Sequence, residues 1–209
     1  MDLGLRGRTV MVCGASRGIG FASAQCFAEA GARVVLVSRS VASLDAAVQR
    51  LEPTGAELQR VAADLATADG IASVLAAVRD VDVLITNTGG PPTGAATGHS
   101  WEAWTAAGEL LLRSAVELTR AYVPGMRARR WGRVVGITSM AVKQPVPSLV
   151  LSNAYRAAVT GYFRTLADEV AGDGVTVNTV LPGYTETERL QELAAATSAR
   201  SGATREQVY

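Results

Sequence analysis

Four side chains in the second half of the chain can act on a polar substrate. Ser139 and Ser152 carry hydroxyl groups that can donate a hydrogen bond, and Arg156 follows Ser152 by four residues. Because residues four apart lie on one face of a helix, Ser152 and Arg156 are predicted to point the same way. Lys143 is the only lysine in the sequence, and desolvation shifts the pKa of a lysine readily. A mechanism that needs a lysine therefore has one candidate.

A glycine-rich segment near the N-terminus has the spacing of a phosphate-binding turn. Gly14, Gly18 and Gly20 follow a β-branched run and open a helical pattern. In such turns the first glycine allows a sharp bend, the second lets backbone approach a pyrophosphate, and the third lets the helix pack on the sheet. The N–H groups at the start of the helix then face the phosphates. Because it lies between a strand and a helix, the motif indicates dinucleotide binding, with Ser16, Arg17 and Ile19 in the same turn.

The residues after the second predicted strand favour one form of the cofactor. NAD-selective sites place a carboxylate there to hold the ribose 2′-hydroxyl, but no Asp or Glu lies between Ala30 and Leu44. Ser38 and Arg39 stand at this place, with Arg17 across from them. Because a guanidinium suits a phosphate in charge and in shape, we predict a preference for NADP(H) over NAD(H).

The elements that must position these residues are six β-branched runs alternating with longer helical patterns. The predicted strands are Thr9–Cys13, Arg33–Ser38, Leu58–Ala62, Val81–Thr86, Arg133–Thr138 and Val175–Val180. The predicted helices are Gly18–Ala30, Val41–Leu51, Ala68–Val78, Trp101–Arg129 and Leu149–Ala171. Several runs are apolar almost throughout, which is typical of parallel strands buried on both faces. The pattern predicts one domain over residues 1–209, with a Rossmann-type, doubly wound α/β sheet in three layers.

The composition excludes several classes of protein. Hydrophobic residues make up 48% of the chain and the net charge is +1, so we expect a sizeable core and no nucleic-acid partner. No apolar run reaches about 18 residues and no signal peptide is evident, so we expect a soluble, cytoplasmic protein without a membrane partner. Cys13 and Cys26 are predicted to be buried, reduced thiols. His99 is the only histidine, so we expect no metal site.

Further residues follow the predicted strands in a familiar order. They are Asp64 and Leu65 after the third, Asn87 and Gly89 after the fourth, Ser139 after the fifth, and Pro182 and Gly183 after the sixth. Together with the glycine turn, this set resembles the short-chain dehydrogenase/reductase family, whose bacterial members include 3-oxoacyl-acyl-carrier-protein reductases. The resemblance covers about residues 3–190.

The resemblance implies hydride transfer between a nicotinamide and a carbonyl or alcohol. It places Asp64 and Leu65 at the adenine, and Asn87 and Gly89 along the adenosine side. It places Pro182, Gly183 and Thr187 at the nicotinamide end. These positions lie at the carboxyl ends of strands, where open α/β sheets bind their ligands. The implied substrate is a small-molecule carbonyl compound or acyl thioester.

The chain departs from the family pattern at the proton-transfer residues. The family has Tyr and Lys four residues apart, where this chain has Ser152 and Arg156. Its Asn, on the long preceding helix, would fall within 109–112, which holds no Asn. Only Ser139 matches by spacing. A phenol with a pKa near 10 needs a nearby cation to act at neutral pH, whereas a serine hydroxyl is a weaker acid and Arg156 cannot exchange its proton. Arg156 can still hold ribose hydroxyls.

Four sources of the missing proton stay open. Tyr155 lies close in sequence but about 60° around a helix from position 152. Lys143 can reach the site if its loop folds back, and Ser139 can act together with water. The fourth possibility is that nothing supplies the proton. A Ser-Lys hydrolase built from Ser139 and Lys143 is disfavoured, because it leaves the glycine turn without a role.

Two functions follow from these observations. The first is an NADP(H)-dependent oxidoreductase that reduces a 3-oxoacyl-type or related ketone with a non-standard proton donor. The alternative is a weak or inactive nucleotide-binding relative with a regulatory or structural role. By the resemblance we expect a homo-oligomer, either dimer or tetramer, paired through the helices 101–129 and 149–171. By the resemblance, a further C-terminal strand is expected to be absent, either because the sequence lacks its C-terminal part or because the fold ends early with an exposed edge. The tail 186–209 is expected to form a short helix or to be mobile.

Overall fold

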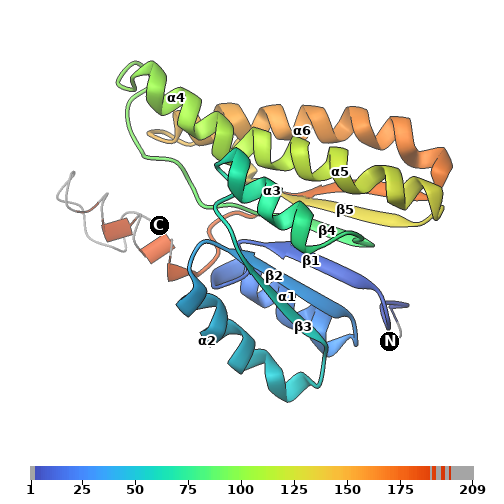
Figure 1. Cartoon of the computed structure of the whole chain (residues 1–209). Coiled ribbons are helices and arrows are strands. Elements are labelled where there is room, and N and C mark those ends of the chain that lie inside the picture. The colour runs from blue at the N-terminus through green and yellow to red at the C-terminus, as the bar shows by residue number, and fades with distance from the viewer. Residues whose placement is uncertain (1–2, 189, 192–193, 196–197, 199–209) are drawn as a thin grey trace.

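Six parallel strands form one sheet in the order β3-β2-β1-β4-β5-β6 (Figure 1). The computed structural model describes residues 3–188, 190, 191, 194, 195 and 198. The strands are β1 (Thr9–Cys13), β2 (Arg33–Ser38), β3 (Leu58–Ala62), β4 (Val83–Thr86), β5 (Gly132–Ile137) and β6 (Val175–Val180). Because every neighbouring pair is parallel, the carboxyl ends of all six strands meet at one edge. The strand order reverses between β1 and β4, which is where open sheets bind their ligands.

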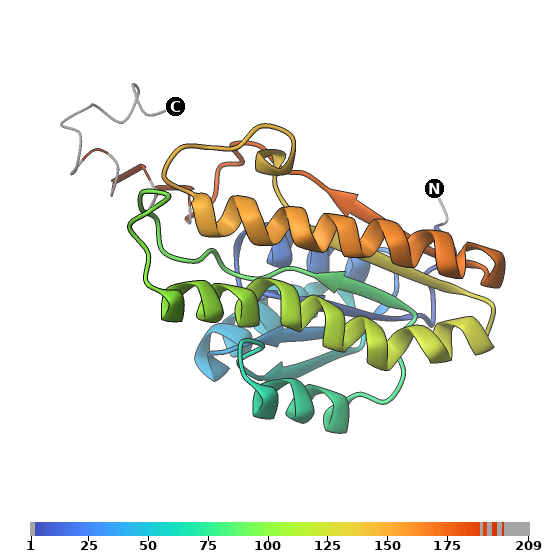
Figure 2. The same ribbon diagram turned by 90° about the horizontal axis from the view of Figure 1, so that it is seen from above.

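Helices cover both faces of the sheet and complete three layers (Figures 1 and 2). They are α1 (Gly18–Glu29), α2 (Val41–Leu51), α3 (Ala68–Ala77), α4 (Trp101–Gly108), α5 (Ser114–Ala128) and α6 (Val150–Val170), with short turns η1 (Glu52–Thr54), η2 (Glu109–Arg113), η3 (Met140–Val142) and η4 (Ala171–Asp173). α1 and α2 bury Phe21 and Leu44 against one face. α3, α5 and α6 bury Val74, Leu118 and Phe163 against the other. The predicted Rossmann-type, three-layer α/β fold is confirmed.

The central strands are buried on both faces, as the apolar runs predicted. All four residues of β4 are buried, as are four of the five in β1, whereas β3 and β6 at the sheet edges expose residues. Four strands have the predicted bounds. β4 begins at Val83, two residues later than predicted, and β5 is shifted one residue toward the N-terminus. Both shifts fall at strand ends, where backbone hydrogen bonds to the neighbouring strand continue at Asp82 and Thr138 beyond the strand bounds.

The predicted single helix 101–129 is wrong in its middle. A π-helical turn, η2, separates α4 from α5, and the Ser114 hydroxyl donates to the Leu110 carbonyl at 2.7 Å beside it. The helical period continues through this turn, so the apolar pattern alone does not reveal it. Gly31, which directly follows the predicted helix 18–30, has a φ of +80°, and its N–H donates to the Ala28 carbonyl at 2.9 Å. This helix end is confirmed.

The two cysteines differ in burial, contrary to the sequence prediction. Cys13 is buried at the end of β1, but Cys26 is exposed. α1 turns Ala24 and Ala28 toward the sheet, and position 26 lies about 200° around the helix from each of them.

Among the described residues, no helix is long and apolar enough to span a membrane. Most of the tail 186–209, including residues 199–209, lies outside the described residues, and so does its predicted structure.

Candidate active site

The phosphate turn joins β1 to α1 and leaves the amino end of the helix accessible. Gly14 and Gly18 have positive φ values of +62° and +56°, which side chains with a Cβ rarely adopt. Arg17 occupies the N-cap position in an extended conformation, and its side chain makes no capping hydrogen bond. Backbone N–H groups at this end are therefore positioned for an anion.

Close backbone contacts explain why glycine stands at the first and third motif positions. A Cβ on Gly20 would overlap the Gly14 carbonyl oxygen and lie 2.9 Å from Nδ2 of Asn87. A Cβ on Gly14 would lie 2.7 Å from the same amide nitrogen. Asn87 also donates to the Cys13 carbonyl at 3.2 Å, so it braces the ends of β1 and β4. The turn therefore has the shape that a dinucleotide-binding loop requires.

A cavity of about 430 Å³ runs along the carboxyl edge of the sheet. Its lining includes most of the predicted cofactor-binding residues, namely Gly14, Ser16, Arg17, Gly18, Ile19, Ser38, Arg39, Asp64, Leu65, Asn87, Gly89, Arg156, Pro182, Gly183 and Thr187. Gly20 lies behind this surface, where it sets the approach of α1. The volume is within the range of small-molecule and cofactor sites.

The end of the cavity at β2 contains positive charge. The Ser16 and Ser38 hydroxyl oxygens lie 3.0 Å apart, which fixes the phosphate turn beside the end of β2. Arg39 is exposed at the same place. Asp64 accepts a hydrogen bond from the Ala66 N–H at 3.0 Å, so its carboxylate caps its own loop. No carboxylate from β2 lines the described part of this end.

The residues after β6 close the cavity on the other side. The Pro182 carbonyl accepts a hydrogen bond from the Met140 N–H at 3.0 Å, which ties this segment to the loop that carries Ser139. Thr187 packs against the phosphate turn, with Cγ2 3.6 Å from the position of a Cβ on Gly18. Glu188 forms an ion pair with Arg17 at 2.7 Å. Sequence reasoning missed this pair, because no local pattern links residues so far apart.

Ser139, Ser152 and Arg156 come together in the same cavity. Ser139 caps η3, where its Oγ accepts a hydrogen bond from the Ala141 N–H at 3.1 Å. Arg156 donates from Nε to Ser152 Oγ at 3.0 Å. Its Nη1 donates to the carbonyls of Ile137 and Thr138 at 3.0 and 3.1 Å. Arg156 therefore fixes both the end of β5 and the Ser152 hydroxyl.

The other two candidates for proton transfer lie elsewhere. Lys143 is exposed and is not part of the described cavity lining. Tyr155 packs against α4, with its ring centroid 6.0 Å from that of Trp104. A Cβ on Gly108 would lie 3.0 Å from the Tyr155 ring. Neither side chain belongs to the described lining that contains Ser139 and Ser152.

The rim of the cavity contains features that the sequence did not reveal. Leu110, in the π-helical turn η2, lines the wall, and it belongs to the segment 109–112 where the resemblance predicted the family Asn. Gly94 forms an isolated parallel bridge with Leu149, which joins the loop after β4 to the loop before α6. His99 lies against this bridge, with Nε2 2.7 Å from the position of a Cβ on Gly94. The only histidine therefore packs in the rim.

The thiol beneath the phosphate turn is shielded from solvent. Burial raises the pKa of the Cys13 thiol to about 12. Such a thiol stays protonated and unreactive near neutral pH. Cys13 therefore has a packing role beneath the site and does not supply a reactive thiolate.

Comparison with known proteins identifies the family. The model of the short chain dehydrogenase family matches residues 8–198. The chain belongs to the short-chain dehydrogenase/reductase family. This short-chain dehydrogenase is 33% identical over 191 residues to an uncharacterized oxidoreductase, YvrD, of Bacillus subtilis, covering 90% of the chain and 72% of the relative. It is 33% identical to a 3-oxoacyl-acyl-carrier-protein reductase of Vibrio cholerae, covering 91% of the chain and 79% of the relative.

Solved structures resemble this short-chain dehydrogenase over 95% or more of its length. The crystal structure of L-sorbose reductase from Gluconobacter frateurii, in complex with NADPH and L-sorbose, has a TM-score of 0.92 and 35% identity, covering 100% of this chain and 81% of that one. A 3-oxoacyl-acyl-carrier-protein reductase from Agrobacterium tumefaciens with NADP bound has a TM-score of 0.84 and 34% identity, covering 95% and 76%. Membership makes the chain an oxidoreductase of the short-chain dehydrogenase type, with a nicotinamide cofactor.

Proposed function

We propose that the chain reduces the carbonyl of a small 3-oxoacyl-type or related ketone to an alcohol, with NADP(H) as cofactor. One observation carries this proposal. A single cavity joins the phosphate turn to Ser139, Ser152 and Arg156, so a bound cofactor and a carbonyl group can meet there. The reductase names of relatives from Vibrio cholerae and Agrobacterium tumefaciens support the substrate class.

The preference for NADP(H) rests on the charges at the end of β2. Arg17 and Arg39 both line the cavity there, beside Ser16 and Ser38. Guanidinium groups bind phosphate through charge and paired donors. The Gluconobacter and Agrobacterium neighbours contain NADPH and NADP, which supports the same preference in this chain.

The two serines are proposed to polarise the substrate carbonyl. Because Arg156 donates to Ser152 Oγ, the hydroxyl hydrogen of Ser152 is available to another acceptor, and a carbonyl oxygen in the cavity is one. Ser139 lies on the same cavity and supplies a second hydroxyl. A nicotinamide cofactor bound along this cavity would supply the hydride for the carbonyl carbon. The positive charge of Arg156 stabilises the negative oxygen that develops there.

The final proton is proposed to come from water held at these serines. Arg156 keeps its own proton near neutral pH, and a serine hydroxyl is a poor acid. Lys143 and Tyr155 lie outside the described lining of the cavity, so neither is assigned this role. The negative oxygen formed by hydride addition takes a proton from water and leaves hydroxide to the solvent.

A second candidate function is cofactor binding with little or no turnover, in a regulatory or structural role. It is supported by the residues at three positions where the resemblance implies Tyr, Lys and Asn: the chain has Ser152, Arg156 and no Asn within 109–112, together with an intact phosphate turn. Both candidates predict NADPH binding, and they differ in whether a carbonyl substrate is consumed.

One experiment separates the two functions. NADPH binding is measured by nicotinamide fluorescence, and its oxidation is then followed by absorbance with acetoacetyl thioesters, cyclic ketones and L-sorbose. Turnover of at least one ketone, lost in a Ser139→Ala variant, is the expected result. Binding without turnover across the panel favours the second function, and the absence of NADPH binding contradicts both.

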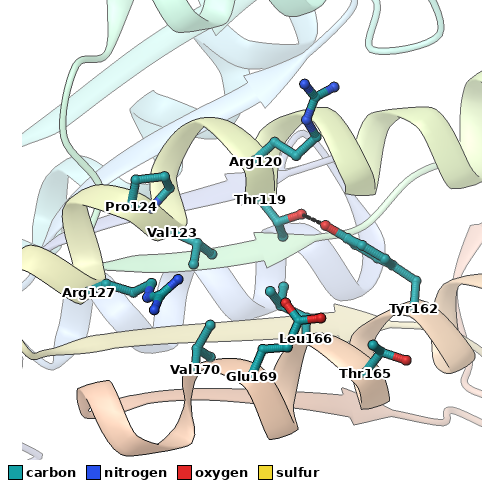
Figure 3. Close-up of a pocket in the computed structure, with 10 residues that line it drawn as sticks. All are labelled: Thr119, Arg120, Val123, Pro124, Arg127, Tyr162, Thr165, Leu166, Glu169 and Val170. Atoms are coloured by element: carbon teal, nitrogen blue, oxygen red, sulfur yellow. Dashed lines mark hydrogen bonds between the residues drawn. The ribbon is translucent and has the colours of Figure 1, made fainter.

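We also propose that two copies of the chain associate through α5 and α6. A groove of about 450 Å³ lies between these helices (Figure 3), and it shares no lining residue with the cofactor cavity. α5 contributes Arg120 and Arg127 to it, and α6 contributes Glu169. In a two-fold pair, α5 of one copy meets α6 of the other, which places these opposite charges together. We expect light scattering to show a dimer or tetramer, and we expect Glu169→Arg to weaken this association. A monomer at all concentrations would contradict the proposal.

Cytoplasmic location stays a prediction from the sequence.

A further inference from the structure

Glu188 connects the segment after β6 to the phosphate turn. Its Oε2 lies 2.7 Å from Nη1 of Arg17, across 171 residues of sequence. The neighbouring Thr187 packs on the same turn, with Cγ2 3.6 Å from the position of a Cβ on Gly18. An apolar contact and an ionic contact therefore both hold this segment against the turn.

Arg17 also belongs to the positive end of the cofactor cavity. Arg17 and Arg39 line the cavity together, and the 3.0 Å contact between the Ser16 and Ser38 hydroxyls keeps the turn beside the end of β2. In dinucleotide-binding sheets, the end of this strand meets the ribose 2′ position. The carboxylate of Glu188 therefore forms an ion pair with a guanidinium at the end of the cavity where a 2′-phosphate would lie.

A carboxylate that is paired with Arg17 opposes the binding of a second anion, the 2′-phosphate, to the same guanidinium. If Arg17 holds both Glu188 and the 2′-phosphate, the two anions repel each other, and if it releases Glu188, an ion pair is lost. Either way, the free energy of NADP(H) binding becomes less favourable. Because NAD(H) has no 2′-phosphate, the free energy of its binding is affected much less.

We propose that Glu188 is a specificity-determining residue, which narrows the preference for NADP(H) over NAD(H) by holding Arg17. This inference rests on the proposed cofactor function of the turn. The side chains of Arg17 and Glu188 are 56% and 65% exposed, so their ion pair contributes little to folding stability. Its effect is therefore expected in cofactor affinity, with little change in the unfolding midpoint.

The test compares the dissociation constants of NADPH and NADH in low salt. Glu188→Gln keeps the size of the side chain and removes its charge, and Glu186→Gln, two residues earlier, is the matched control. We expect Glu188→Gln to tighten NADPH binding by about two- to fivefold and to leave the NADH constant unchanged. Glu186→Gln is expected to change neither constant.

A second pair of variants assigns the effect to Arg17. In an Arg17→Gln background, Glu188→Gln is expected to lose its effect on NADPH, and about 1 M salt is expected to reduce the effect in the parent chain. Equal changes for both cofactors, or an effect that survives in the Arg17→Gln background, would overturn the proposal. If the unaltered chain binds neither cofactor, the proposed function fails and this inference fails with it. If it binds both and Glu188→Gln changes nothing, only the inference fails.

Discussion

The cavity has two halves that differ in which atoms form them: the cofactor half at the phosphate turn, and the catalytic half at Ser139, Ser152 and Arg156. Around the phosphate turn the site consists mainly of backbone, with positive φ values at Gly14 and Gly18 and an uncapped helix end. Around Ser139, Ser152 and Arg156 it consists of side chains on a strand end and a helix. A backbone site changes only when strands and helices move, whereas a side-chain site changes by single substitutions on an unaltered fold. The replacement of the proton donor that the resemblance predicts at position 152 therefore requires no change in the fold.

The largest effect is expected from filling the backbone site. In Gly20→Ala the new Cβ overlaps the Gly14 carbonyl oxygen, an overpacking that costs about 3 kcal/mol of stability if the turn stays in place. Relief of the overlap displaces the phosphate turn, and we expect the dissociation constant for NADPH to rise about 100-fold. Fluorescence titration measures it. Gly161→Ala is the control, because nothing lies within 4 Å of a Cβ there, and helix propensity predicts a gain of about 0.5–1 kcal/mol in stability. Unchanged affinity in a folded Gly20→Ala chain would show that the turn is not a phosphate site.

Replacing Arg156, the central side chain of the catalytic half, tests whether that half takes part in the reaction. Arg156→Ala deletes the donors to two carbonyls and to Ser152 Oγ. We expect kcat to fall about 10- to 100-fold, and the unpaired carbonyls to cost about 1–3 kcal/mol in the free energy of unfolding. Ser152→Ala is expected to lower kcat and to leave stability nearly intact. If Ser152→Ala keeps full turnover, the proposed role of its hydroxyl is wrong.

The charge at the end of β2 is expected to have an intermediate effect. Arg39→Ala removes one guanidinium from the lining of the cavity, and the loss of a charge-assisted hydrogen bond predicts about a tenfold weaker affinity for NADPH. The affinity for NADH is expected to stay the same. Parallel titrations with both cofactors provide the measurement, and an equal loss for both would argue against contact with the 2′-phosphate.

Cys13, beneath the turn, predicts a dependence of stability on pH. Burial raises its pKa from 9.0 to about 12, so the unfolded chain loses this proton first as the pH rises. Stability is therefore unaffected below pH 9 and falls between about pH 9 and 12, with a slope of up to about 1.4 kcal/mol per pH unit. Urea unfolding at pH 8 and 10 measures this slope. Cys13→Ala is expected to lack it, and Cys26→Ala, at an exposed position, is expected to retain it.

The smallest effect is expected at the only lysine. Lys143 is exposed and outside the described lining of the cavity, so Lys143→Ala is expected to change kcat by less than about twofold, as surface substitutions do. Steady-state kinetics with the best ketone of the panel measures it. A large loss of kcat in this variant would place a lysine in the catalytic half and contradict water as the proton source.

Local patterns predicted the fold because they encode it directly. The apolar runs gave four strands with their observed bounds, and the spacing of Gly14, Gly18 and Gly20 predicted a turn whose shape depends on neighbouring backbone. The π-helical turn was not predictable, because it preserves the helical period. The ion pair between Arg17 and Glu188 and the exposed place of Lys143 depend on how distant loops pack. Charge type and spacing carry no information about that packing.

The bridge between Gly94 and Leu149 makes the two loops of the rim a single mechanical unit. The Gly94 N–H donates to the Ser148 carbonyl at 2.8 Å, and Pro91 and Leu149 on either side line the cavity. An insertion or deletion in one loop therefore displaces the wall contributed by the other. Efforts to change the substrate range of this chain must redesign both loops together, because neither can be exchanged as an independent module.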